Sequence, residues 1–273
     1  MEIEKGDGKR MNILVFDTET ISVDKPFCYN IGYVIYDTDG HKILVKRDFV
    51  VEQVWYNQPL FETAYYYDKR QIYVDGMRSR KTKLMKYGFI QRKMISDIKQ
   101  YHVDGAYAFN SDFDERVFKF NSDYYHCSNA LELIPVYDIR GHAVSTIATD
   151  GYFDFCDKNS DIKGADGKSK KFITDADGYK TTAESFYCFM RDDAEYNEEH
   201  TALADSLIEL EILLKACADG ADLTQHYAVP RSLPRNTPKV MYIKRGKEVI
   251  ATFDYVSKTE RKCADGVAIS IRG

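Results

Sequence analysis

The first fifty residues alternate between short apolar runs and turn residues, a pattern typical of sheet strands. The apolar run 13–16 predicts a buried strand, and it leads directly into two acids, Asp17 and Glu19. The β-branched and aromatic positions within 31–51, interrupted by turn residues at 37–40, predict a β-hairpin. Three sheet strands are therefore expected here, with both acids projecting from one face at the end of the first strand.

Residues 60–103 have a mainly helical but irregular pattern that contains a basic run at 78–99. Asp97 is the only acid in that run, although the chain as a whole is acidic. Two interpretations remain open. The run is a solvated helix face, or it is a surface that follows a phosphate backbone while neighbouring aromatic rings stack on bases. The concentration of positive charge in an acidic chain slightly favours the second interpretation.

The short apolar run 106–109 predicts another buried strand, which gives way to a helix after Asn110. We expect Ser111 or Asp112 to cap this helix, which places Asp114 in its first turn, near the strand end. A carboxylate in a first helical turn is favourable by itself. Asp114 therefore has a purely structural explanation as well as a functional one.

The chain changes character after a further strand or helix predicted at 131–147. The polar, glycine-containing stretch 154–180 predicts a long loop or an exposed hairpin inserted into the domain. Its aspartates Asp157, Asp161 and Asp166 leave a calcium site open, although their spacing fits no EF-hand loop.

Helical order is expected to resume with a cap at Thr181 or Thr182. The strongest helical pattern spans 203–214, and its apolar residues fall on two faces, as in a helix packed between layers. Asp205 lies on the isoleucine face, and a buried carboxylate needs a partner or a metal ion. On one continuous helix His200 would lie about 140° away from Asp205. We therefore expect His200 at or before the helix start if the two serve one site.

Three prolines after residue 225 predict a linker, and the following pattern predicts a hairpin at 239–254 and a third strand at 267–271. We therefore divide the chain into a flexible tail at 1–10, a main domain at 11–225 that contains the 154–180 insertion, and a small β extension at 230–273.

The composition limits the possible functions. The 273 residues carry a formal net charge of −5 and are 44% hydrophobic, which allows a packed core but excludes nucleic-acid binding through overall positive charge. The six cysteines are scattered without a CxxC pair, which argues against a structural zinc site and indicates free thiols in a reducing compartment. No apolar run is long enough to cross a membrane, and we expect a cytoplasmic protein.

The acids become informative when they are considered together. They form a DxE pattern at Asp17 and Glu19, an NxxxD pattern ending at Asp114, and an HxxxxD pattern from His200 to Asp205. The order and the spacing of these patterns resemble the DEDDh, or DnaQ-like, family of 3′–5′ exonucleases.

The resemblance covers about residues 11–217 and implies an α/β fold: an RNase H-like mixed β-sheet flanked by helices, to which this sequence adds a small C-terminal β appendage. It implies a metal-dependent 3′–5′ exonuclease that releases nucleoside monophosphates from single-stranded DNA or RNA. One alternative is a catalytically inactive nucleic-acid-binding or polymerase-interacting module of the same fold. Another is a non-nuclease metal protein with structural acids. A polymerase or another replication or repair protein is a candidate partner.

Hydrolysis of a phosphodiester requires stabilisation of charge on the attacking and the leaving oxygen, which two divalent metal ions can provide together. Mg²⁺, or Mn²⁺ in its place, takes oxygen ligands. The ligands implied by the resemblance are Asp17, Glu19, Asp114 and Asp205. Histidine as a residue type titrates in the range of a general base, and His200 is assigned the removal of a proton from water. Candidate contacts to the terminal nucleotide are Thr18, Thr20, Ile21, Asn110 and Phe113. Of these, Ile21 and Phe113 either wedge between the last two bases or are ordinary core residues.

Overall fold

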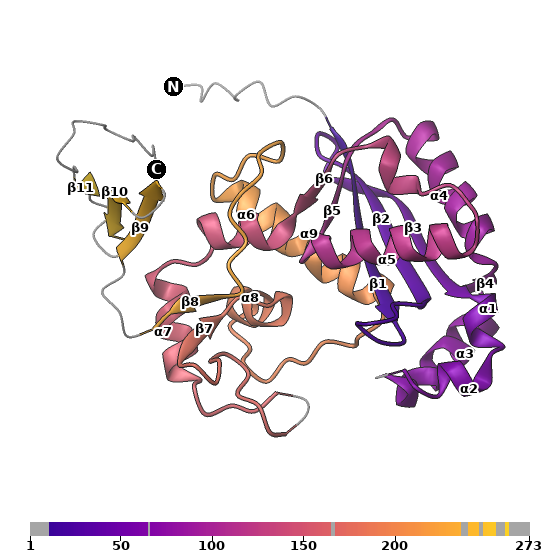
Figure 1. The fold of residues 1–273 in the computed structure, drawn as a ribbon, viewed down its shortest axis with the longest axis horizontal. Coiled ribbons are helices and arrows are strands. Elements are labelled where there is room, and N and C mark those ends of the chain that lie inside the picture. The colour runs from indigo at the N-terminus through magenta and orange to yellow at the C-terminus, as the bar shows by residue number, and fades with distance from the viewer. Residues whose placement is uncertain are drawn as a thin grey trace.

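The computed structural model describes residues 11–235 except 65 and 165–166, together with the backbone of 240–245, 248–254 and 260–261 (Figure 1). The expected tail at 1–10 and the expected strand at 267–271 lie outside the described residues.

A six-stranded mixed sheet forms the centre of the structure, in the order β4-β3-β2-β1-β5-β6. Its strands are β1 (Asn12–Thr20), β2 (Cys28–Asp37), β3 (Lys42–Val51), β4 (Lys83–Met85), β5 (Val103–Ala108) and β6 (Val136–Asp138). β2 runs antiparallel to its neighbours β1 and β3, β4 is parallel to β3, and β5 and β6 continue parallel beside β1. This topology places β1, the strand that carries Asp17 and Glu19, inside the sheet between β2 and β5.

Helices cover both faces of the sheet. The α-helices are α1 (Glu52–Trp55), α2 (Gln58–Phe61), α3 (Arg70–Arg78), α4 (Tyr87–Gln100), α5 (Ser111–Tyr124), α6 (Ile139–Thr146), α7 (Asp150–Lys158), α8 (Ala183–Arg191) and α9 (Ala202–Ala218), and the short 3-10 helices are η1 (Tyr67–Lys69) and η2 (Ala130–Leu133). Leu14 and Phe16 of β1 pack in the core beneath α4 and α5, whereas Ile13 and Val15 pack in the core beneath α6 to α9. Because neighbouring strand residues point to opposite faces, an apolar run fills both cores. The mixed α/β fold class expected from the sequence is confirmed.

Two smaller sheets accompany the central one. β7 (Gly178–Lys180) pairs antiparallel with β8 (Ser232–Pro234). β9 (Val240–Arg245), β10 (Glu248–Asp254) and β11 (Glu260–Arg261) form a three-stranded sheet in the order β11-β10-β9. The predicted C-terminal hairpin is the antiparallel pair of β9 and β10.

Several local predictions need correction. The mainly helical region 60–103 also contains β4, and the region 131–147 holds both a strand, β6, and a helix, α6. The stretch 154–180 begins inside α7, and its residues Phe172 and Ile173 are buried in the core beneath α6 to α9. These two apolar residues anchor a segment whose composition is otherwise polar, so the stretch is not an exposed hairpin throughout.

The remaining structural expectations concern the cysteines, the membrane and calcium. The five cysteines within the described residues are all free thiols, and Cys263 lies outside them. None of the described helices combines the length and the apolar character needed to cross a membrane. Of the three aspartates considered for calcium, Asp157 pairs with Arg235, and Asp166 lies outside the described residues.

Candidate active site

The candidate site is built around the end of β1, where Asp17 and Glu19 lie two residues apart on one strand. Ligand oxygens of Asp17, Glu19 and Asp205 all lie within 4.8 Å of one another. The DxE pair and the acid of the third predicted pattern therefore meet, although 186 positions separate Asp205 from Glu19 in the sequence. His200 and Asp114 are not members of this closest group.

The first turn of α9 is fixed onto the sheet by β2, and this contact places Asp205 beside β1. The side-chain carbonyl of Asn30 accepts a hydrogen bond from the main-chain N–H of Ala202 at 2.8 Å, and Ser206 donates to the carbonyl of Gly32 at 3.1 Å. A Cβ atom at Gly32 would lie 2.1 Å from the nitrogen of Leu203, closer than real Cβ atoms approach. Glycine is required there because the helix backbone contacts the strand directly.

Asp114 reaches the site from the β5–α5 junction. The structure corrects the predicted cap of α5: the N-cap is Asn110, with a left-handed φ of 68°, and its side chain forms no capping hydrogen bond. The carboxylate of Asp138, from β6, instead accepts hydrogen bonds from the main-chain N–H groups of Asn110 and Ser111 at 3.2 and 3.0 Å. Thr18 donates to Asp114 at 2.6 Å and so connects α5 to β1.

Burial and mutual repulsion disfavour the charged forms of these acids. Burial raises the pKa of Asp17 to about 7, and burial together with the charge of Asp17 raises the pKa of Asp205 to about 9. Burial, and then the charges of Asp17, Asp205 and Asp114, raise the pKa of Glu19 well above its ordinary value. The pKa of Asp114 is raised in the same way, by burial and by Asp17. Like charges held this close are stable only when a cation or protons compensate them.

The residues present fit a divalent cation. The oxygens come from carboxylates, the ligand type that Mg²⁺ and Mn²⁺ prefer. Oδ1 of Asp205 is buried and has no hydrogen-bond partner among the described residues. A buried carboxylate oxygen is expected to have such a partner, and a cation would provide one. Asp17, Glu19 and Asp205 are therefore the residues that would hold a metal ion, with Asp114 as a further candidate beside Asp17.

Glu209 is a further buried acid of this cluster, which the sequence analysis missed. It accepts a hydrogen bond from the main-chain N–H of Phe109 at 3.3 Å. Burial raises its pKa well above the ordinary value, and the charges of Asp17, Asp114 and Asp205 add to the effect. Glu209 lies four residues after Asp205, one helical turn further on the same face. That spacing was the available signal, but Glu209 lies among apolar residues and belongs to none of the three patterns.

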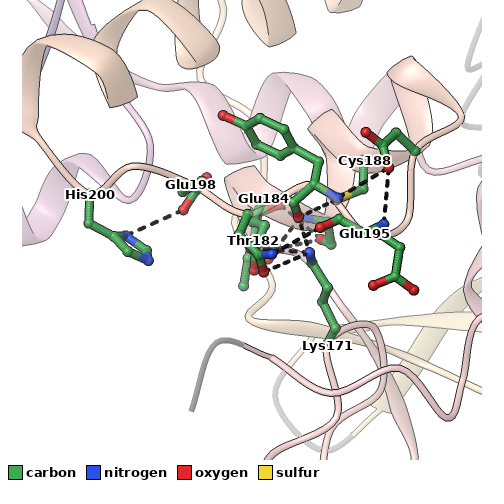
Figure 2. A network of polar contacts seen from close by, with 11 residues as sticks. Lys171, Thr182, Glu184, Cys188, Glu195, Glu198 and His200 are labelled. Atoms are coloured by element: carbon green, nitrogen blue, oxygen red, sulfur yellow. Dashed lines mark hydrogen bonds and ion pairs between the residues drawn. The ribbon is translucent and has the colours of Figure 1, made fainter. Parts of the chain in front are cut away.

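His200 lies before α9, two residues ahead of Ala202, which is the position expected if it serves one site with Asp205. Its backbone is left-handed, with φ 55°, and its ring stacks on Tyr66 with 4.4 Å between the ring centroids. Nδ1 lies 3.8 Å from a carboxylate oxygen of Glu198, as Figure 2 shows. Burial, reinforced by the charge of Lys69, lowers the pKa of His200 to about 4. At neutral pH the imidazole is therefore uncharged and able to accept a proton.

A polar cavity of about 870 Å³ opens beside His200. Its lining includes Tyr66, Lys69, Lys171, Glu184, Glu198 and His200. Burial and the charge of Glu184 raise the pKa of Glu198 to about 8. The lysines therefore meet fewer negative charges at neutral pH than the number of acids in the lining suggests.

The predicted nucleotide contacts are divided between the surface and the core. Thr20 and Asn110 are half-buried, whereas Thr18 is buried and already donates to Asp114. Ile21 is buried in the core beneath α4 and α5, which leaves little surface for a base to contact. Phe113 is only partly buried, packs against the same core, and has the guanidinium of Arg116 5.6 Å from its ring centroid. Phe113 is therefore better placed than Ile21 to meet a base.

Comparison with solved structures gives a weak similarity to a known nuclease. No protein-family model matches the chain, and no curated protein sequence matches it. The chain is similar to a solved structure of E. coli Exonuclease I in complex with a dA16 oligonucleotide, with 13% sequence identity and a TM-score of 0.44. The match covers 75% of this chain and 41% of the exonuclease chain, so this chain matches less than half of that protein. A similarity at this level assigns no activity, and the function has to be argued from the site itself.

Proposed function

We propose that this chain is a metal-dependent 3′–5′ exonuclease that hydrolyses single-stranded DNA or RNA into nucleoside monophosphates. The observation that carries the proposal is the cluster of Asp17, Glu19 and Asp205, whose ligand oxygens lie within 4.8 Å of one another around a buried Asp205 oxygen that has no hydrogen-bond partner among the described residues. A neutral histidine, His200, lies on the segment that leads into the same helix.

Each residue has a defined role in the proposed reaction. Divalent ions held by the carboxylates, Mg²⁺ or Mn²⁺, would neutralise charge on the attacking and leaving oxygens. Asp17, Glu19 and Asp205 would hold these ions, with Asp114 as a further ligand. His200 takes the proton of the attacking water, which its lowered pKa permits across the neutral range. The hydrogen bond from Thr18 fixes the orientation of Asp114.

The basic residues of α3, β4 and α4 and of the connections between them are proposed to bind the strand. The residues of the predicted basic run differ in their surroundings. Lys93 pairs with the buried Asp97 at 2.6 Å, so part of the positive charge of the run is neutralised. The exposed basic residues of the run are Arg78, Arg80, Lys81, Lys83, Lys86, Arg92 and Lys99. The guanidinium of Arg92 lies 4.2 Å from the ring centroid of the exposed Phe89. Positive charge beside an exposed ring suits a single strand, whose phosphates and bases it contacts together.

The test is a degradation assay with 5′-labelled single-stranded DNA and RNA of one sequence. Stepwise shortening from the 3′ end with Mg²⁺ or Mn²⁺, lost in chelator and in Asp17→Ala and His200→Ala, would support the proposal. We expect each substitution to reduce kcat by at least about a hundredfold. Binding of the oligonucleotides without shortening, under either metal, would instead indicate a catalytically inactive binding module.

A further inference from the structure

The segment that carries His200, residues 192–201, joins α8 to α9 without regular secondary structure. Two residues of this segment, Asp192 and His200, have left-handed backbones, with φ of 50° and 55°. Such conformations are uncommon for residues other than glycine and persist where surrounding contacts hold them. The position of the imidazole therefore depends on whatever fixes this segment.

Lys171 holds the segment at one point. Its side chain is 1% exposed and pairs with Glu184 of α8 at 3.3 Å. Its ammonium also donates to the main-chain carbonyl of Tyr196 and to the side-chain carbonyl of Asn197. A lysine ammonium has three N–H donors, and these three acceptors satisfy them. A lysine is buried this deeply only when its charge is paired, so the contact specifies one position of the segment.

Lys69 holds the same segment at a second point, Glu199. Its ammonium donates to the main-chain carbonyl of Glu199, next to His200, and lies 5.4 Å from the ring centroid of Tyr66. Tyr66 in turn stacks on the imidazole of His200, with 13° between the ring planes. Burial and neighbouring acids raise the pKa of Glu19 and of Asp205, and the charge of Lys69 partly offsets that rise, so this lysine also acts on the acid cluster.

We infer that Lys69 and Lys171 are positioning residues for His200: from sequence-distant parts of the chain, each ammonium donates to a main-chain carbonyl of the 192–201 segment, and together they set where the imidazole lies. This inference rests on the proposed function for the role of His200. The contacts of the two lysines with the 192–201 segment, called the clamp below, do not depend on the proposed function. Both lysines lie outside the three sequence patterns.

The first test measures the segment directly, by limited proteolysis of the full chain. Endoproteinase Glu-C cuts after glutamate, and Glu195, Glu198 and Glu199 lie within the segment. We expect cleavage there, located by mass spectrometry, to be about tenfold faster in Lys69→Met and in Lys171→Met, because local opening becomes easier. Lys215→Met is the matched control: this lysine pairs with Asp219 on the exposed end of α9, and its loss should leave the rate unchanged.

The second test measures kinetics on the labelled oligonucleotide. A misplaced base should reduce kcat by about ten- to a hundredfold while KM changes by less than about twofold. Lys69→Arg retains a cationic donor and should recover part of the loss. Because Lys171→Met leaves Glu184 without its cation, the double variant Lys171→Met/Glu184→Gln is included, with melting curves for every protein.

The outcomes separate the two proposals. If the wild-type chain degrades no oligonucleotide but Glu-C cuts the two lysine variants faster than the wild type, the clamp is supported and the exonuclease proposal is wrong. If the wild-type chain is active and the variants match it in both cleavage rate and kcat, the clamp is wrong. In an active enzyme, faster Glu-C cleavage of the variants with unchanged kcat would also overturn the inference, since the lysines would then hold the segment without positioning His200.

Discussion

At the scale of single residues, the acid cluster that the proposed function requires lowers the stability of the folded protein. Asp17 and Asp205 are held close together and largely out of water, which disfavours their charged forms. Glu209 adds another buried carboxylate behind them. A sequence selected for stability alone would not gather these groups, so the cluster is better explained by a bound cation than by packing.

Replacing Asp17 by asparagine should stabilise the metal-free protein. The pKa of Asp17 is raised from 3.8 to about 7, so the folded wild type binds more protons than the unfolded chain between these values and loses stability as the pH rises through them. The advantage of Asp17→Asn should therefore grow from about pH 4 to about pH 7 and then level off. We expect at least about 1 kcal/mol at pH 8, or about 2–4 °C in melting temperature for a domain of roughly 200 residues.

Thermal melts in chelator at pH 5 and pH 8 would measure this effect, and the same melts with Mg²⁺ or Mn²⁺ provide the control. Metal should stabilise the wild type and have little effect on Asp17→Asn, because ion binding is then weakened. A variant that is less stable than the wild type in chelator at pH 8 would show that the carboxylate of Asp17 is satisfied within the protein.

The three sequence patterns singled out Asp17, Glu19 and Asp205 as candidates, and the structure brings ligand oxygens of these three acids together. Asp17 and Glu19 follow an apolar run, and the position of His200 before its helix follows from helical geometry. Glu209 was missed because it lies among apolar residues, and its significance depends on what packs against α9. Ile21 was considered for base contact, but a sequence does not show which apolar residue the core takes up.

At the scale of elements, side chains from neighbouring strands hold the helices that carry the acids. Asn30 of β2 caps α9, and Asp138 of β6 caps α5. The pattern of apolar and polar residues predicted β1 to β3, β5, α5 and α9, but these caps are tertiary contacts. No local pattern connects Asn30 with Ala202 across the chain, and for the same reason the short strand β4 was missed within a mainly helical region.

Removing the cap of α5 should destabilise the protein and disturb Asp114. Asp138→Ala leaves the N–H groups of Asn110, Ser111 and Arg140 without their shared carboxylate acceptor. We expect a loss of about 1–2 kcal/mol in the free energy of unfolding, measured by urea denaturation. Asn129→Ala, which removes the side-chain cap of the short η2, is the matched control and should cost less. Equal losses would show that Asp138 contributes no more than an ordinary cap.

At the scale of the whole molecule, charge is distributed unevenly. The chain carries a formal net charge of −5, yet exposed lysines and arginines concentrate in the run 78–99, which spans the end of α3, β4, α4 and the connections between them. A polyanion approaching such a molecule is repelled overall and attracted locally, so binding should depend on this surface and on salt. Composition alone could exclude a uniformly basic protein, but only the structure shows that Lys93 is paired while its neighbours Lys83 and Lys86 are exposed.

Reversing charge on this surface should weaken oligonucleotide binding and its dependence on salt. In Lys81→Glu/Lys83→Glu/Lys86→Glu, three candidate phosphate contacts are lost. The slope of log affinity against log salt should then fall in magnitude by about 2, since each contact on a single strand contributes about 0.7. Lys119→Glu/Lys158→Glu/Lys215→Glu changes the net charge equally, from −5 to −11, on α5, α7 and α9. Fluorescence anisotropy with a labelled strand at several salt concentrations, in chelator to prevent cleavage, would compare the two. If both variants lose the same affinity and keep the same slope, net charge rather than this surface governs binding, and the strand reaches the acid cluster by another path.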